Sequence, residues 1–199
     1  MNVPNTLSAI RLLLIPAFCV AFLSGPDYYI WAALALALSG LSDLFDGYFA
    51  RKLNQITELG KWLDPIADKL TLGAVVVCMW IVYHESYPML TPLFCILIAK
   101  EFMMAVGGLI VTHGRTEMIP SQWWGTVGTM IFYVCMLCIV LLSVFGGDNV
   151  SPVIMTVLVA LPAAAMLFAF IKYLIFGIKI MREKQPEGAN DENVTEQVG

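Results

Sequence analysis

Long apolar segments, separated by short polar connections, constrain this chain more than any other feature of its sequence. Apolar residues make up 59% of the 199 residues and charged residues only 13%, an apolar share above that of ordinary soluble domains. Six segments are long enough, at about 20 residues, to cross the hydrocarbon core of a membrane as helices. They lie at residues 1–24, 28–50, 60–83, 92–112, 123–145 and 152–180.

We therefore predict an all-α integral membrane protein with a single domain, residues 1–182, that contains six transmembrane helices. The last residues have a different composition, with five acidic residues between Glu183 and Glu196. Such a polar, charged segment cannot bury enough apolar surface to fold by itself, so we expect residues 183–199 to form a disordered tail. We expect membrane lipids, and no nucleic acid, among its partners.

The distribution of Lys and Arg predicts how the helices are oriented. The connections at 24–28, 83–91 and 145–151 contain no Lys or Arg. Basic residues at 51–52, 61, 115 and 179–184 all fall on the opposite side, which the positive-inside rule makes cytoplasmic. We therefore expect a protein of the cell membrane with both termini in the cytoplasm.

Four aspartates lie close together between the second and third apolar segments. Asp43, Asp46, Gly47, Ala50 and Arg51 are spaced to share one face of a helix, and Gly60, Asp64 and Asp68 share one face of the next helix. A short polar connection at residues 52–59 would let these two helices pack antiparallel with both acidic faces inward. Gly40 and Ser42 are small enough to allow a neighbouring helix to approach closely.

Converging carboxylates at membrane depth would repel one another unless a cation lay between them. Carboxylate oxygens are hard ligands that suit Mg²⁺, Mn²⁺ or Ca²⁺, so this stretch predicts a metal site at the cytoplasmic end of the second and third helices. The alternative is that the aspartates are solvated helix-end charges, or pair with Arg51, Lys61 and Lys69. Four aspartates on two matched faces favour the metal site over this alternative.

These eight residues, from Asp43 to Asp68, match the signature of the CDP-alcohol phosphotransferase family in identity and spacing. The opening, residues 3–16, also resembles that of phosphatidylglycerophosphate synthases and the related cardiolipin synthases. The resemblance covers about the first 110 residues well. It implies six-helix membrane enzymes, usually homodimers, that use two divalent cations, Mg²⁺ or Mn²⁺, and transfer a group from a CDP-linked donor to an acceptor hydroxyl.

The resemblance also assigns roles to individual residues. It implies that Asp43, Asp46 and Asp64 hold metal, and that Asp68 is both a ligand and the general base for the acceptor hydroxyl. For the CDP donor, Gly47 and Gly60 would let backbone approach the nucleotide, Ala50 would leave room for the cytidine, and Arg51 would bind phosphate in bidentate fashion. Asp43 is expected to contact the donor as well. No activated Ser, Cys or His is found nearby, so direct in-line displacement is the simplest reaction.

The acceptor site is less strongly specified. Lys100 and Glu101 lie halfway along the fourth segment, a costly depth for charges, in a run that resembles the Arg-Glu element of phosphatidylglycerophosphate synthases. Arg11 either extends to the membrane interface or binds phosphate. We expect Lys100, Arg11 and Glu101 to contribute to the acceptor site, with Lys100 and Glu101 about 100° apart and not required to pair. Basic residues of the family are replaced here by Gly108, Thr126 and Gly128.

The leading hypothesis is therefore an enzyme of phospholipid biosynthesis that transfers phosphatidyl from CDP-diacylglycerol to glycerol 3-phosphate, giving phosphatidylglycerophosphate and CMP. The missing basic groups keep open a cardiolipin synthase, which would use phosphatidylglycerol, or another CDP-alcohol phosphotransferase. A small metal-ion transporter is the alternative from a different class. Against it, the acids cluster at one face and no charged relay crosses the outer half of the segments.

Overall fold

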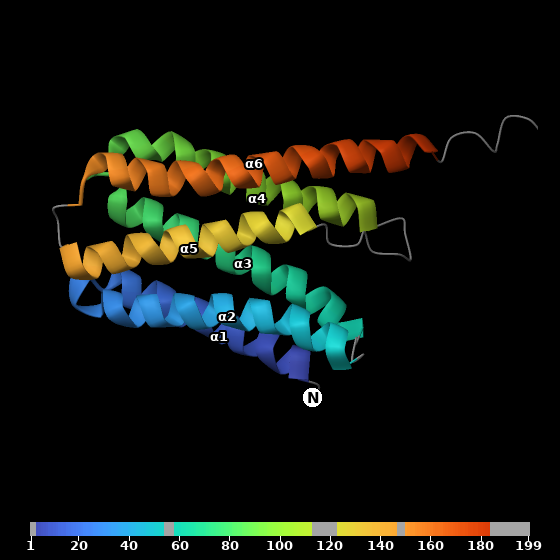
Figure 1. The fold of residues 1–199 in the computed structure, drawn as a ribbon, viewed down its shortest axis with the longest axis horizontal. Coiled ribbons are helices and arrows are strands. Elements are labelled where there is room, and N and C mark those ends of the chain that lie inside the picture. Colours follow the sequence, from blue (N-terminus) through green and yellow to red (C-terminus); the bar gives the residue numbers. More distant parts are fainter. Residues whose placement is uncertain (1–2, 54–57, 113–122, 147–149, 184–199) are drawn as a thin grey trace, which may run out of the picture.

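The computed structural model describes the backbone of residues 3–53, 58–112, 123–146 and 150–183. Side chains are described for residues 6, 8–45, 66–104, 106–107, 125–146 and 150–175. Within these ranges the chain is helical, with no strand (Figure 1). The helices are α1 (Val3–Leu23), α2 (Tyr29–Leu53), α3 (Glu58–Tyr83), α4 (Thr91–Thr112), α5 (Trp123–Gly146) and α6 (Pro152–Glu183), with short 3₁₀ helices η1 (Pro26–Tyr28) and η2 (Pro88–Leu90). The prediction of an all-α protein is confirmed for the described residues.

The helix ends lie close to the predicted ones because local signals set them. Gly25 adopts φ 110°, a conformation open mainly to glycine, and Pro26 then begins η1. The two largest departures are at the polar connection and at the C-terminus. Helix α2 continues to Leu53 and α3 begins at Glu58, so the connection between them is shorter than residues 52–59. The predicted tail, apart from Glu183 at the end of α6, lies outside the described residues.

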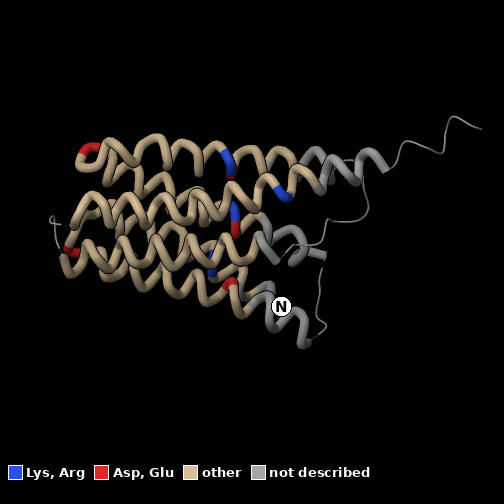
Figure 2. Tube along the Cα trace, turned by 45° about the horizontal axis from the view of Figure 1, so that its top comes forward, with Lys and Arg blue, Asp and Glu red and all other residues tan. Residues whose placement is uncertain are grey.

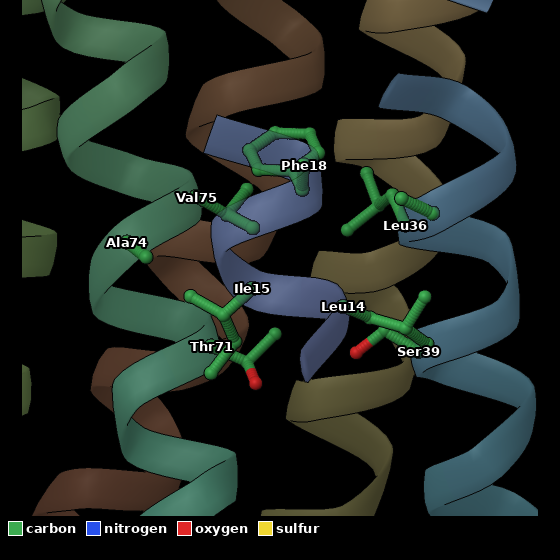
Figure 3. Close-up of a pocket in the computed structure, with 9 residues that line it drawn as sticks. Leu14, Ile15, Phe18, Leu36, Ser39, Thr71, Ala74 and Val75 are labelled. Carbon is green, nitrogen blue, oxygen red and sulfur yellow. The ribbon is translucent and has the colours of Figure 1, made fainter. Parts of the chain in front are cut away.

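Helix α1 lies between α2 and α3, as Figure 3 shows at the level of a small pocket. Its contacts with both helices are extensive, whereas α2 and α3 touch each other little in the described part of the chain. The expectation that α2 and α3 pack directly together is therefore wrong there. The physical reason is the aromatic face of α1: Phe22 is fully buried and its ring stacks on Phe18 and on Tyr29, and burying this face needs neighbours on both sides.

Small residues bring the remaining helices into close contact. A Cβ atom on Gly40 would lie 3.2 Å from Cδ1 of Tyr133, so the absence of a side chain lets α5 lie against α2. The predicted close approach at Gly40 is thus confirmed, with α5 as the neighbour. Gly128 plays the same part between α5 and α6, where its Cβ would meet the Ala165 carbonyl oxygen at 3.7 Å.

Hydrogen bonds tie the helices together at the end of the bundle that holds η1 and η2. The Tyr83 and Ser143 hydroxyls lie 2.6 Å apart and join α3 to α5. Tyr87 donates a hydrogen bond of 2.8 Å to the Val150 carbonyl oxygen, just before α6. The first residues of α1 and the last residues of α6 both point toward the opposite end of the bundle, on different sides of it (Figure 1).

Four described helical segments are long and apolar enough to cross a membrane. They are Pro26–Phe45, Ile66–Tyr83, Gly125–Gly146 and Pro152–Ile175, and α1 adds a shorter apolar stretch, Ser8–Leu23. These segments support a membrane protein. The count of six spans and the cytoplasmic orientation stay predictions. Figure 2 shows that basic and acidic positions gather toward the end of the bundle that holds the N-terminus, whereas the opposite end carries acidic positions alone among the described residues.

Candidate active site

All eight signature positions lie on the two predicted helices. The residues from Asp43 to Arg51 occupy the last turns of α2, and those from Gly60 to Asp68 occupy the first turns of α3. Among their side chains the structure describes those of Asp43 and Asp68. The side chains of Asp46, Gly47, Ala50, Arg51, Gly60 and Asp64 lie outside the described residues. The roles assigned to these six residues therefore stay predictions.

Helix α1 supplies the partner of Asp43. The Arg11 Nη1 atom lies 3.0 Å from the Asp43 Oδ1 atom, and the Arg11 side chain is only 1% exposed. Of the two alternatives for Arg11, extension to the membrane interface is therefore wrong, because the guanidinium is held inside the bundle. A guanidinium at this depth needs a carboxylate to offset its desolvation, and Asp43 provides one.

Asp68 brings a second carboxylate to the same place. Its Oδ1 atom is buried and has no hydrogen-bond partner among the described residues. The carboxylate lies close enough to Asp43 and Glu101 to be repelled by them, and close enough to Arg11 and Lys69 to be attracted. Asp43 and Asp68 therefore interact electrostatically, and the convergence of all four aspartates stays a prediction.

Helix α4 adds a pair of opposite charges. The Lys100 ammonium contacts the Glu101 carboxylate directly, and both side chains are about nine-tenths buried. The 100° between the two positions on the helix did not require them to pair. They do pair, because the lysine side chain is long enough to reach the carboxylate. Lys69 interacts electrostatically with both members of the pair and with Asp68, and so links the α4 charges to the aspartates.

Sequence reasoning missed two further polar groups, Ser39 and Tyr133. Ser39 lies one turn before Asp43 on α2, and the Tyr133 phenol from α5 interacts electrostatically with Asp68, Asp43 and Arg11. The only sequence signal for Tyr133 was Gly40, which predicted a close neighbour without identifying it. In contrast, Gly128 on α5, one of the positions where the family has a basic residue, serves packing, because its Cβ would lie 3.7 Å from the Ala165 carbonyl oxygen of α6.

The described carboxylates fit a hard divalent cation in their chemistry. Asp43 and Asp68 offer oxygen donors from two helices, and the buried Oδ1 atom of Asp68 has no protein partner among the described residues to satisfy it. No group of three or more potential ligands occurs among the described side chains, and Asp46 and Asp64 are not among them. The residues present are thus a partial ligand set of the right type.

The chain resembles characterised proteins over most of its length. Residues 1–171 match the model of the CDP-alcohol phosphatidyltransferase family. A CDP-diacylglycerol–glycerol-3-phosphate 3-phosphatidyltransferase of Aquifex aeolicus is 29% identical over 182 residues, which cover 91% of this chain and 98% of that protein. A protein of the same name from Bacillus subtilis is 32% identical over 142 residues, covering 64% of this chain and 70% of that protein.

A relative with a different name is also similar. The cardiolipin synthase (CMP-forming) of Streptomyces coelicolor is 40% identical over 119 residues, which cover 57% of this chain and 54% of that protein. Both kinds of relative carry names of phospholipid-synthesising transferases. With the family match extending over all of α1 to α5 and most of α6, the chain belongs to the CDP-alcohol phosphatidyltransferase family and is a membrane enzyme of the phosphatidyltransferase type.

Proposed function

We propose that this protein transfers a phosphatidyl group from CDP-diacylglycerol to glycerol 3-phosphate, releasing CMP. The observation that carries the proposal is the electrostatic interaction of Asp68 on α3 with Asp43 on α2, within an intact eight-residue signature. The Aquifex aeolicus and Bacillus subtilis relatives, both named for this reaction, support the choice of acceptor. The site would lie at the cytoplasmic end of the bundle, in a homodimer in the cell membrane.

Two divalent cations, Mg²⁺ or Mn²⁺, held by Asp43, Asp46, Asp64 and Asp68, would offset the negative charge of the donor diphosphate. Arg51 would add a bidentate contact with a phosphate, and Gly47, Ala50 and Gly60 would leave room for the nucleotide. Arg11 holds the Asp43 carboxylate in place from α1. The Asp43 carboxylate is thereby paired before the acceptor enters.

The transfer itself is a single displacement at phosphorus. The acceptor hydroxyl oxygen forms a bond to the phosphorus that carries the diacylglycerol, the bond from that phosphorus to the CMP oxygen breaks, and the hydroxyl proton moves to Asp68. The Asp68 Oδ1 atom suits this role because no described protein group donates a hydrogen bond to it. Lys100, held by Glu101, would bind the phosphate of glycerol 3-phosphate.

A second candidate acceptor is phosphatidylglycerol. Two observations favour it: the similarity to the Streptomyces coelicolor cardiolipin synthase, and the presence of Gly108, Thr126 and Gly128 where basic residues would bind a second phosphate. On α5, Gly128 instead packs against the backbone of α6. A lipid acceptor needs a cavity open to the membrane and no additional anion pocket.

One experiment separates the two acceptors. Purified protein with Mg²⁺ or Mn²⁺ and CDP-diacylglycerol is given glycerol 3-phosphate, phosphatidylglycerol or other alcohols, and CMP release is followed together with the lipid product. The proposal expects phosphatidylglycerophosphate from glycerol 3-phosphate. Cardiolipin formation with no response to glycerol 3-phosphate would support the second candidate. An absence of CMP release with every acceptor would contradict both.

A further inference from the structure

Three buried side-chain oxygen atoms near the aspartates have no hydrogen-bond partner among the described residues. They are the Asp68 Oδ1 atom, the Ser39 hydroxyl and the Tyr133 hydroxyl, and they come from α3, α2 and α5. Buried polar groups are almost always hydrogen-bonded, since leaving one without a partner is unfavourable. Three such atoms in one region indicate a place where a polar group from outside the chain is held.

Tyr133 is positioned for this by helix packing. Its ring lies against Gly40, whose missing side chain leaves space for it, and the residue is only 9% exposed. The hydroxyl lies beside that of Ser39, outside hydrogen-bonding geometry, and interacts electrostatically with Asp68 and Asp43. The phenol therefore enters the aspartate site from the α5 side.

Thr71 shows by contrast that Ser39 is unusual. Both residues line the small pocket between α1, α2 and α3, and Figure 3 shows their hydroxyl-bearing side chains at the same end of it. The Thr71 hydroxyl, however, donates a 2.7 Å hydrogen bond to the Ala67 carbonyl oxygen of its own helix. Ser39 makes no such bond to α2, so its hydroxyl remains available to a group in the site.

The chemistry of the three atoms specifies what fits between them. The Ser39 and Tyr133 hydroxyls can each donate and accept one hydrogen bond or more, whereas an ionised Asp68 carboxylate only accepts. A hydroxylic oxygen satisfies this set, because it can accept from Tyr133 or Ser39 while donating its proton to Asp68. Such an oxygen belongs either to a water molecule or to the acceptor alcohol.

We propose that Tyr133 is a positioning residue of the transfer reaction: together with Ser39, it holds a hydroxylic oxygen against Asp68 Oδ1 and so orients that carboxylate toward the acceptor hydroxyl. The inference rests on the proposed function, because it assigns Tyr133 a part in the same proton transfer. It does not depend on which alcohol is the acceptor, since glycerol 3-phosphate and phosphatidylglycerol both react through a hydroxyl.

The test is the steady-state kinetics of Tyr133→Phe, which removes one oxygen atom and keeps the ring against Gly40. We expect kcat to fall by up to about tenfold, the upper end of the effect of one lost hydrogen bond between neutral groups, with the KM for CDP-diacylglycerol changed less than about twofold. An unchanged acceptor KM identifies the oxygen as water, and a raised acceptor KM identifies it as the acceptor hydroxyl. Ser39→Ala should lower kcat in the same way, and the double variant should lose less than the product of the two effects.

Tyr83→Phe is the matched control. Tyr83 is equally buried, at 8% exposure, but bonds to Ser143 at the far end of the bundle, so its variant should lose thermal stability and keep its kcat. If Tyr133→Phe behaves like Tyr83→Phe, the hydroxyl is merely structural and the inference is wrong. Should Tyr133→Phe fail to fold, the kcat of Ser39→Ala decides between the same two outcomes. A wild-type protein that releases no CMP would overturn the proposed function itself, and the inference with it.

Discussion

The ion pair between Arg11 and Asp43 allows a quantitative test of how the site is held together. Replacing Arg11 by Met removes the guanidinium that lies 3.0 Å from the Asp43 carboxylate. Breaking a buried ion pair by removing one partner costs about 3–5 kcal/mol. Because the Asp43 side chain is still 29% exposed, we expect the lower end of this range, about 3 kcal/mol.

The measurement is the free energy of unfolding in mixed detergent micelles, followed by circular dichroism. The double variant Arg11→Met/Asp43→Asn closes a mutant cycle, in which the pair should show a coupling energy of about 1 kcal/mol or more because the two groups are in contact. Lys172→Met serves as the control, since Lys172 is an exposed cation that lies over the Phe168 ring. It should cost no more than about 1 kcal/mol.

A loss below about 1 kcal/mol for Arg11→Met, or additive effects in the cycle, would refute the view that the pair stabilises α1 against α2. The kinetics of the same variant test the other role expected for Arg11. If Arg11 binds the acceptor, the variant should raise the acceptor KM while unfolding like the wild type. Stability and acceptor affinity therefore separate a structural arginine from a binding one.

Four further outcomes are expected. Excess EDTA should abolish CMP release, and added Mg²⁺ or Mn²⁺ should restore it; undiminished release would exclude a metal-dependent reaction. Asp43→Asn should weaken donor binding, whereas Asp68→Asn should lower kcat far more than donor affinity. Asp27→Asn, at an exposed position, is the control and should leave both kcat and donor affinity unchanged. If Asp68→Asn turns over within a few-fold of wild type, Asp68 is not the general base. Lys100→Met should raise the KM for glycerol 3-phosphate steeply and Lys100→Arg should not, and unchanged kinetics in the Met variant would contradict an acceptor role. A cysteine at Ser86, in a background without the native cysteines, should react with an impermeant thiol reagent on intact cells; labelling only after lysis would reverse the predicted topology.

The sequence alone determined the helices and the acidic faces they carry. Apolar length, together with turn residues such as Gly25 and Pro26, was sufficient to locate the helix ends to within a few residues, because these signals act locally along the chain. Helical spacing likewise predicted that Asp43 and Asp68 each lie on the acidic face of their helix. This works because a helix is periodic, so residues four apart share a face wherever the helix is placed.

The tertiary structure alone decided which helices are neighbours and which charges pair. It inserted α1 between α2 and α3, gave Arg11 to Asp43, closed the Lys100–Glu101 pair and brought Tyr133 beside Ser39. The sequence near each of these residues does not predict its contact. The contacts between helices depend on how whole helix surfaces pack, and the Lys100–Glu101 contact depends on the direction in which a long side chain bends. The pattern of apolar residues does not decide which neighbouring helix buries a given apolar face. Only the fit of particular side chains, such as the Tyr133 ring against Gly40, selects one neighbour.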